Sequence, residues 1–451
     1  MKPVIATLVG VFIAFGAQVA FGETEGRVSL SQASFLSPDF ELTGKKDYQL
    51  IGAGLDTLRD VRGEQEIENS LQAHVRGMVA PGTSVLNYLN VSQLYWKQNL
   101  LSVGRKKIVW NRLDENYLLG SYQPLFKWNP LLTETQGLTG IFIHLETSET
   151  ALPWGVTLMG SPLFIPNQGA GYELKDGTFQ ESNPYFKAPP RQALANEQEF
   201  DINYTLQKPE AQDVVLQQSF AGRVFVGEMG KGPFWQVAYA RKPMNELNLG
   251  FIGYAPSTAG QINVDILPAV SNHTLVSSDL QYASKFLTVG VSGLHEDSEE
   301  PNYKSEWTYS TFTSSMLVSP YVEGRFKGAE LHVSVLSVEG GDSRIKGPQS
   351  SESENFIPQR YPFRNAGLAS LKYQYRIKRF ENIGLATRYL RGSEGEFDLW
   401  TNQISYQWRE KWAANLISQL VAVENNSNGR KTAFDSYLNN DLVAIGISYV
   451  F

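Results

Sequence analysis

The last ten residues of the chain, LVAIGISYVF (442–451), alternate between two kinds of side chain. Large apolar residues occupy every second position, and small or polar residues lie between them. The apolar set is Val443, Ile445, Ile447, Tyr449 and Phe451. Because successive side chains of a β-strand point to opposite faces, this pattern predicts a strand with one apolar face.

The same period of two recurs far along the chain ahead of this strand. In 397–409, for example, Trp400 and Ile404 alternate with Thr401 and Gln403. On this basis we expect about 20 strands, many of them 9–12 residues long. They lie near 26–36, 47–57, 67–79, 85–96, 100–110, 138–147, 153–160, 199–207, 213–226, 233–242, 246–255, 272–282, 286–295, 305–326, 329–340, 361–376, 382–391, 397–409, 412–424 and 436–451.

Strand length and loop length both favour a membrane barrel over a soluble β-sandwich. A strand of ~9–11 residues crosses a bilayer at ~45°. The connections are predicted to alternate strictly between short and long, as in outer-membrane barrels, whereas a sandwich has no reason to keep such parity. The short ones are 97–99, 242–246, 283–285, 327–328, 377–381 and 410–411, and the long ones are 111–137, 161–198, 256–271, 341–360 and 425–435.

Tryptophans at predicted strand ends add to this pattern, because aromatic residues gather at the two membrane interfaces of such barrels. They are Trp110, Trp154, Trp235, Trp307, Trp408 and Trp412. Lipid cannot satisfy an open sheet edge, so the strands must close into a barrel. The first two strands have the weakest pattern, and dropping them as a pair leaves 18. We therefore expect an all-β, transmembrane antiparallel β-barrel of about 18 strands (16–20), with long extracellular loops folding into the lumen.

The N-terminus predicts export from the cytoplasm. Lys2 precedes an apolar stretch from Val4 to Gly16, and small residues follow up to Gly22, ahead of Glu23. This is the layout of a secretory signal peptide, and the apolar core is short for a spanning helix. We expect residues 1–22 to be a signal peptide and 23–451 to form a single barrel domain in the outer membrane.

Composition excludes several functional classes. The 39 Lys and Arg against 46 Asp and Glu disfavour a nucleic-acid partner, and the absence of Cys excludes a thiol nucleophile and Cys-ligated metals. No zinc-type His-Glu-x-x-His, Gly-x-Ser-x-Gly, EF-hand loop or phosphate-binding glycine loop occurs. His332 and Ser334 share a predicted inward face, but we expect no enzymatic activity and no cofactor.

Two stretches resemble known families. The terminal strand, 445–451, resembles the C-terminal signature of Gram-negative outer-membrane β-barrels, which implies that Tyr449 and Phe451 are read by the barrel assembly machinery. The strand 103–110, VGRKKIVW, with Gly104 and Arg105 followed after four residues by Trp110, is similar to a strand of porin-like families, including alginate-export-like barrels, that begins with Gly-Arg and ends with Trp. There it lies just ahead of a loop that folds into the lumen.

Two long connections are candidates for narrowing the pore. Residues 111–137 contain many apolar side chains, too many to float freely in water, and connections of this length are usually functional. We expect 111–137 to be an inward-folded constriction loop; the alternative is an extracellular cap. Residues 161–198 carry five prolines, which argues against regular structure and predicts an ordered loop, lid or partial plug.

Charged residues on predicted inward faces complete the candidate pore lining. The pore-lining and constriction candidates are Arg105, Asp114, Glu115, Arg223, Lys372, Arg376, Arg388 and Arg409. Opposed acidic and basic groups across a narrow opening would sort solutes by charge. For any one of the arginines, the alternative is a structural ion pair inside the barrel. The acidic run Glu296, Asp297, Glu299 and Glu300 predicts a solvated loop tip.

The sequence thus predicts a porin-like channel for passive passage of small hydrophilic solutes. One alternative is gated or specific uptake of hydrophobic or oligosaccharide substrates along aromatic residues such as Phe126, Trp128, Tyr185 and Phe186. A second is a structural or adhesive barrel with a blocked lumen. The expected surroundings are the lipid bilayer and lipopolysaccharide. Many porin-like barrels are homotrimers, but no trimer-facing patch can be told from a lipid-facing one in the sequence.

Overall fold

The computed structural model describes residues 25–37, 46–57, 70–147, 152–180, 183–195, 198–254, 260–348, 360–379, 381–392, 397–423 and 434–451. The predicted signal peptide, 1–22, lies outside these residues. No helix in the described part of the chain is long and apolar enough to cross a membrane.

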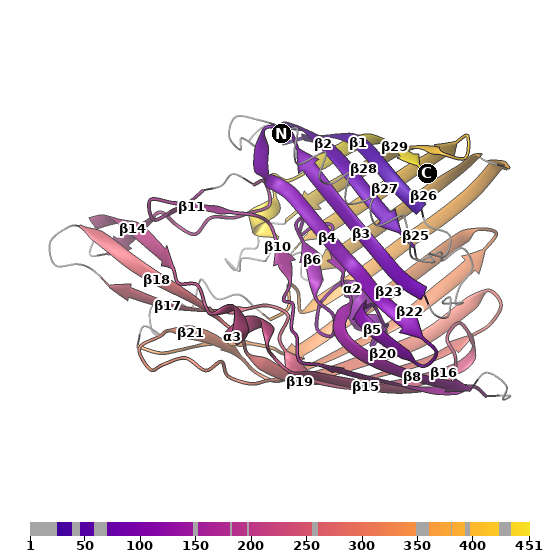
Figure 1. The fold of residues 1–451 in the computed structure, drawn as a ribbon, viewed down its shortest axis with the longest axis horizontal. Coiled ribbons are helices and arrows are strands. Elements are labelled where there is room, and N and C mark those ends of the chain that lie inside the picture. Colours follow the sequence, from indigo (N-terminus) through magenta and orange to yellow (C-terminus); the bar gives the residue numbers. More distant parts are fainter. Residues whose placement is uncertain are drawn as a thin grey trace.

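Eighteen antiparallel strands form one sheet that closes on itself (Figure 1). They are β1 (Glu25–Phe35), β2 (Asp47–Asp56), β3 (Ser70–Ala80), β4 (Thr83–Gln98), β5 (Leu101–Lys106), β8 (Leu138–Thr147), β9 (Trp154–Ser161), β15 (Ser219–Glu228), β16 (Lys231–Pro243), β19 (Asn272–Ala283), β20 (Leu287–Ser298), β22 (Ser315–Phe326), β23 (Ala329–Gly340), β25 (Asn365–Lys378), β26 (Glu381–Gly392), β27 (Asp398–Trp408), β28 (Trp412–Ala422) and β29 (Leu442–Val450). The predicted antiparallel barrel of 18 strands is confirmed.

The barrel closes where its first and last strands pair. Val28 of β1 lies opposite Tyr449 of β29, and the backbone of Gly26 exchanges two hydrogen bonds with Phe451. The Phe451 ring covers Gly26 so closely that a Cβ there would lie 2.4 Å from the ring. Closure removes both sheet edges, which is what lipid requires of a spanning sheet.

The number of barrel strands was predicted correctly, but the strands to be left out were not the first two. Both β1 and β2 belong to the barrel. The predicted strands 199–207 and 246–255 correspond to β14 (Gln198–Leu206) and β17 (Asn248–Tyr254), which pair with β13 (Gln192–Ala195) and β18 (Gln261–Ala269) in a separate sheet. A period of two identifies a strand but does not say which sheet it joins.

The separate sheet projects from one end of the barrel (Figure 1). Further short elements lie in these and in the other long connections. They are β6 (Leu125–Lys127), β7 (Glu134–Thr135), β10 (Gln168–Gly169), β11 (Glu173–Lys175), β12 (Thr178–Gln180), β21 (Tyr309–Phe312) and β24 (Ser343–Lys346), with the helices α2 (Arg112–Tyr117) and α3 (Ala211–Val215) and the 3₁₀ turn η2 (Asp435–Tyr437).

Long connections gather at this end and short turns at the other, where the C-terminus also lies. By the rule for outer-membrane barrels, the long-connection end is extracellular and the short-turn end periplasmic. The predicted strict alternation is wrong at four places. The β3–β4 turn at 81–82 and the β26–β27 connection at 393–397 are short at the extracellular end. The β2–β3 connection at 57–69 is longer at the periplasmic end, and 242–246 opens a long connection between β16 and β19.

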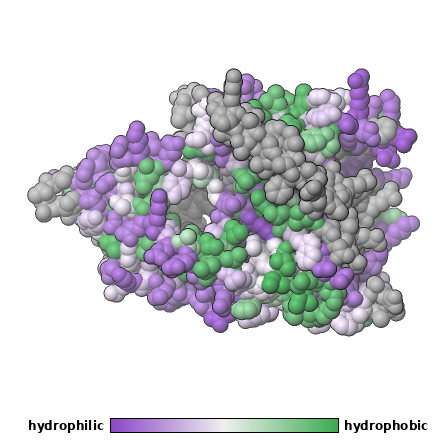
Figure 2. All heavy atoms as spheres, in the orientation of Figure 1, coloured by the Kyte–Doolittle hydropathy of each residue, from purple (hydrophilic) through white to green (hydrophobic). Residues whose placement is uncertain are grey.

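On the face drawn in Figure 2, hydrophobic residues gather over the barrel, whereas hydrophilic residues are most frequent on the projecting connections and at the opposite end. Trp154, Trp235 and Trp412 are exposed on the outer surface at the short-turn end, as expected for an interface girdle. Trp110 and Trp307 are buried and do not belong to it, because their segments fold inward or pack against other connections.

Candidate functional site: a loop across the barrel lumen

The connection between β5 and β8, residues 107–137, enters the lumen at the Gly104–Arg105 step. Gly104 has φ 130°, and a Cβ there would lie 2.3 Å from the carbonyl oxygen of Leu94. This conformation interrupts the pleat of β5 and lets Arg105 reach the loop. Its Nε donates to the carbonyl oxygen of Gly137 at 3.1 Å, and its Nη2 donates to Oε1 of Gln136.

A short helix, α2, forms the part of the loop inside the barrel (Figure 1). The Asn111 side chain caps it by accepting a hydrogen bond from the Asp114 N–H at 3.1 Å. Leu118 then takes a left-handed conformation (φ 53°) and ends the helix. The Asp114 carboxylate accepts the backbone N–H groups of Ser121 and Tyr122, each at 2.9 Å, so it folds the chain back on itself.

Hydrogen bonds fix α2 to barrel strands that are not neighbours of β5. Asn111 Nδ2 donates to Oδ1 of Asp279 on β19 at 3.1 Å. The Tyr117 hydroxyl lies 3.1 Å from Oγ of Ser334 on β23. Further contacts along the loop join Arg112 to Glu323 on β22, Tyr122 to Ser277 on β19, Arg223 on β15 to the carbonyl oxygen of Val109, Arg388 on β26 to that of Asn116, and Asn129 to Gln419 on β28.

Apolar packing supports these contacts. Trp110, Leu113, Tyr117, Tyr122 and Leu131 are buried against inward-facing wall residues. The wall residues include Phe142, Ala238, Leu275, Leu294, Leu317, Leu368 and Leu399. The connection therefore crosses the lumen as a packed layer, and the expectation that long loops fold into the lumen is confirmed.

The second long connection closes part of the extracellular mouth. The Tyr185 ring packs on Phe35 at 6.0 Å and on Trp128 at 5.6 Å between centroids. The Asn183 amide donates to the carbonyl oxygen of Val85 at 2.9 Å, and Asn440 donates to that of Pro184 at 2.7 Å. Residues 183–187 therefore cover this side of the mouth, and we call them the lid segment.

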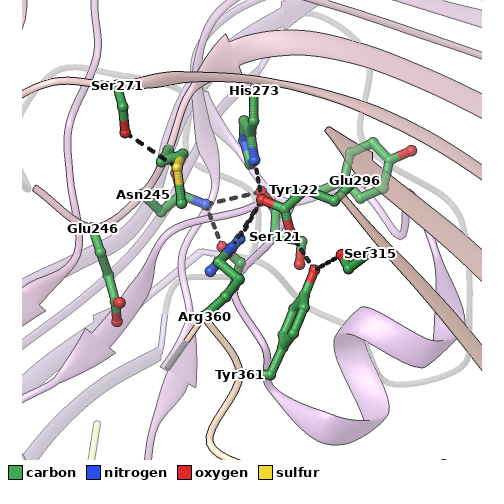
Figure 3. A network of polar contacts seen from close by, with 12 residues as sticks. Ser121, Tyr122, Asn245, Glu246, Ser271, His273, Glu296, Ser315, Arg360 and Tyr361 are labelled. Atoms are coloured by element: carbon green, nitrogen blue, oxygen red, sulfur yellow. Dashed lines mark hydrogen bonds and ion pairs between the residues drawn. The ribbon is translucent and has the colours of Figure 1, made fainter. Parts of the chain in front are cut away.

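A buried ionic network holds a third connection against the wall (Figure 3). The Glu296 carboxylate on β20 accepts hydrogen bonds from Nδ1 of His273 at 2.5 Å, from Nε of Arg360 at 2.9 Å and from the Tyr361 hydroxyl. Lys242 Nζ lies 3.3 Å from Nε2 of His273. Because Arg360 and Tyr361 precede β25, the network fixes the β23–β25 connection.

The same network also contacts the loop 107–137 described above. Lys242 Nζ donates to Oδ1 of Asn245 at 2.9 Å, and the Asn245 amide donates to the carbonyl oxygen of Gly120 at 2.6 Å. The interpretation of Glu296 as part of a solvated acidic tip was wrong, since Glu296 is 1% exposed. The alternation of β20, in which Ser292 and Leu294 point inward, continues one step further to Glu296 and could have shown this.

Below the loop, toward the periplasm, inward-facing side chains stay in contact with solvent. Lys372 and Arg376 on β25 and Gln403 on β27 are exposed on the lumen face. A cavity of about 170 Å³ opens beside β1–β3, and its lining includes Arg27, Arg76 and Tyr88. Small residues such as Ser29, Gly52 and Gly54 leave the space for it. The periplasmic half of the lumen is thus an aqueous vestibule with charged walls.

The eight predicted pore residues fall into four groups. Arg105, Arg223 and Arg388 hold the loop 107–137 by hydrogen bonds to its backbone. Asp114 and Glu115 lie within that loop. Lys372 and Arg376 face the vestibule, whereas Arg409 lies in the periplasmic turn between β27 and β28 with φ 51°. Their part in sorting solutes stays a prediction.

The two acidic residues of the loop are shielded from water. Burial raises the pKa of the Asp114 carboxyl, although the two N–H groups oppose the shift. Burial, with Asp114 nearby, raises the pKa of Glu115 to about 7. Glu115 accepts hydrogen bonds from Nε2 of Gln123 at 2.6 Å and from Oγ1 of Thr135 at 3.2 Å. Its charge therefore changes near neutral pH.

The inward pair His332 and Ser334 lies in a row with Glu323. Nδ1 of His332 is 3.3 Å from Glu323 Oε1, and its Nε2 is 3.1 Å from Oγ of Ser334. The row has the order of a hydrolase triad. However, Ser334 is 3% exposed, and its hydroxyl contacts Tyr117 of the loop. The row serves as a docking point for α2.

Comparisons with known proteins find likenesses among solved structures. The sequence matches no protein-family model and no curated protein. Among solved structures, it is similar to a BenF-like porin from Pseudomonas fluorescens Pf-5 (8% identity, 96% of this chain and 99% of that one, TM-score 0.41). It is also similar to OccAB4 of Acinetobacter baumannii (10% identity, 96% and 99%, TM-score 0.39) and to OccK2 (OpdF) of Pseudomonas aeruginosa in complex with glucuronate (10% identity, 95% and 98%, TM-score 0.41).

The closed sheet, the apolar outer face and the charged, loop-crossed interior are properties of the chain itself. Such a closed sheet is stable in a bilayer. It is the architecture of the β-barrel proteins that span Gram-negative outer membranes. The chain is therefore a closed, 18-stranded antiparallel β-barrel with the architecture of outer-membrane barrels.

Proposed function

We propose that the protein is a channel for small hydrophilic solutes, narrowed by the constriction loop 107–137. The observation that supports this most is the contrast between the two halves of the lumen. Inward-facing Lys372 and Arg376 are exposed to water, whereas inward-facing Leu275 and Leu317, nearer the extracellular end, are buried by the loop. An 18-stranded barrel is wide enough to hold an aqueous channel, and the loop reduces its width.

Charge would add selectivity to this narrow passage. The vestibule carries exposed guanidinium and ammonium groups, while Asp56 lies on another part of the wall and Glu134 lies in the loop 107–137. Nδ1 of His74 is 2.8 Å from the Asp56 carboxylate, and Nη1 of Arg76 is 3.8 Å from that of Glu134. Charged groups of both signs in a confined space make a field that separates solutes by charge.

Gated uptake is the second candidate, and the covered mouth favours it. Phe35, Leu50, Val421 and Leu442 face inward near the extracellular end and are buried by the connections above them. Phe126, Tyr88 and Trp128 form a row with centroids 4.9 and 5.1 Å apart, on which the faces of sugar rings could pack. In this version, movement of the lid segment 183–187 opens the path.

Swelling of liposomes that contain the refolded protein tests the proposal. The solutes are a pentose, a disaccharide and a trisaccharide, and the second protein is Asn440→Ala, which removes the hydrogen bond to the carbonyl oxygen of Pro184 in the lid segment. Permeation by the pentose with a steep decline at larger sizes supports the diffusion channel. Permeation only in Asn440→Ala supports the gated form. No permeation in either folded protein overturns both and favours an adhesive barrel.

The C-terminal strand is proposed to act during assembly. Tyr449 and the exposed Phe451 lie on the outer face at the periplasmic end, where assembly machinery could reach them. Lipopolysaccharide would surround the extracellular rim.

A further inference from the structure

A row of hydrogen-bonded polar side chains crosses the lipid-facing surface of β26, β27 and β28. The Trp400 indole Nε1 donates to Oγ1 of Thr387 at 2.8 Å, and Oγ1 of Thr387 donates to Oδ1 of Asn402 at 2.7 Å. The Asn402 amide then donates to Oγ of Ser418 at 3.1 Å. We call Thr387, Asn402 and Ser418 the polar ladder.

The direction of these side chains follows from their pairing. Arg388 and Gln419 point inward, because both contact the constriction loop. Thr387 and Ser418 are their neighbours in sequence and point outward. Asn402 lies opposite Thr387 on one side and Ser418 on the other, so it shares their face.

The polar ladder lies at mid-membrane depth. Trp408, at the periplasmic end of β27, is six residues from Asn402. At ~3.4 Å per residue and a tilt of ~45°, this distance is about 14 Å along the membrane normal, near the middle of the ~25 Å apolar band. Apolar side chains flank the ladder, with Trp400 and Leu420 above it and Ile404 and Leu416 below it.

The opposite wall differs at the same depth. Most of the mid-strand outward residues of β15, β19, β20 and β22 are aliphatic. They include Val224, Val276, Leu280, Val291, Val318 and Val322. Ser278 of β19 is polar, but its hydroxyl accepts the Trp235 indole N–H at 3.1 Å, and it has no amide neighbour in the outward row of its strand.

The polar ladder keeps hydrogen-bonding capacity that lipid cannot use. Asn402 has two amide hydrogens and two acceptor positions on Oδ1, and the ladder uses one of each. Ser418 accepts from Asn402 and keeps its own hydroxyl hydrogen as a donor. An acyl chain offers no partner to such groups, and unsatisfied polar groups are costly in hydrocarbon.

We propose that the outer face of β26–β28 is a contact surface for a second copy of this chain. A partner at this depth has to be embedded in the membrane itself. The polar ladder offers a donor and an acceptor side by side on Asn402, so two copies facing each other can exchange amide hydrogen bonds. The apolar residues around it supply packing area, as in interfaces with a polar centre between apolar contacts. This inference is independent of the proposed channel function.

The absence of Cys from the chain allows a direct test with single reporters. Ile404→Cys places a thiol beside the ladder and leaves Asn402 intact, and Leu280→Cys is its control on the opposite wall. Both residues are exposed on the outer surface. Each variant is refolded into phospholipid vesicles and oxidised gently. Migration of unheated and heated samples confirms the folded barrel.

The expected result is a disulfide-linked product of twice the chain mass for Ile404→Cys and none for Leu280→Cys. Adding Asn402→Leu to the Ile404→Cys variant should lower the linked fraction by about tenfold, the effect of losing one or two buried hydrogen bonds. Equal linking at both reporters, no linking at Ile404→Cys, or linking unaffected by Asn402→Leu overturns the proposal. Capture of a protein of another mass in native membranes also overturns it.

Discussion

Nδ2 of Asn111 lies 3.1 Å from Oδ1 of Asp279 and 2.8 Å from Oγ of Ser292, so the cap of α2 is fixed to two neighbouring strands of the barrel wall. Asp279 also faces the backbone N–H of Arg112 and the amide of Gln236. One carboxylate on β19 thus positions the start of the helix in the lumen. In the proposed channel, the width of the passage would depend on this contact.

Replacing Asn111 by Ala should widen the passage. The change removes the helix cap and both wall contacts, at a cost of about 1–3 kcal/mol to the docked loop. We expect larger and noisier conductance steps in a planar bilayer. Asn382→Ala is the matched control, since Asn382 bonds to Gln407 at 2.8 Å away from the loop and should leave the step size unchanged. Identical steps in both variants would show that the loop does not limit the flow.

Charge reversal at Lys372 and Arg376 should shift ion selectivity toward cations. Both side chains are exposed on the vestibule wall, so the double change to Glu replaces two positive charges by two negative ones in contact with passing ions. The measurement is the reversal potential under a salt gradient. Arg409→Glu, in the periplasmic turn, should have a smaller effect. A larger effect at Arg409 would place the selective region in the turns.

Glu115 should make the stability of the protein depend on pH near neutrality. Its pKa is raised from 4.5 to about 7 by burial, so the folded state binds more protons than the unfolded state between these values. The stabilisation of the protonated form is complete below about pH 4.5 and is lost as pH rises through 7. The loss is on the order of 3 kcal/mol at most.

Urea unfolding in detergent at several pH values measures this effect. The wild type should lose stability from pH 5 to pH 8 relative to Glu115→Gln, which cannot ionise. If the free energy of unfolding changed with pH in the same way in both proteins, the titrating group would be a residue other than Glu115.

Gly104→Ala should impair folding. A side chain at φ 130° is strained, and its Cβ would approach the carbonyl oxygen of Leu94 to 2.3 Å. The expected cost is about 1–3 kcal/mol, seen as a lower urea midpoint and a smaller folded fraction. Gly324→Ala is the control, because nothing lies within 4 Å of a Cβ at that position. An unchanged midpoint for Gly104→Ala would contradict the account of how the chain turns into the lumen.

The sequence was sufficient for the architecture because the membrane imposes a simple rule on every strand. Alternation such as that of Val443, Ile445 and Ile447 has to match one lipid-facing side, and it does so around the whole ring. The rule does not distinguish barrel strands from strands in connections. For this reason the sequence did not distinguish β14 and β17 from barrel strands. The first two strands, β1 and β2, were instead left out of the predicted barrel because their alternation is weak.

The lumen was harder to predict because its contacts join residues far apart in sequence. Asn111 and Asp279, or Glu296 and Arg360, meet only after closure of the barrel, and no local pattern pairs them. Arg105, Arg223 and Arg388 were found as inward-facing charges, but their alternation gave no sign that they hold a loop. Lys242 and His273 were missed entirely, although both follow the inward parity of their strands.

Single-channel recording of the refolded wild type and of Asn111→Ala, side by side in planar bilayers, tests the central claim most directly. A channel narrowed by the loop 107–137 predicts discrete steps for the wild type and larger ones for the variant. Two folded proteins that both leave the bilayer silent would contradict the claim that this barrel conducts solutes.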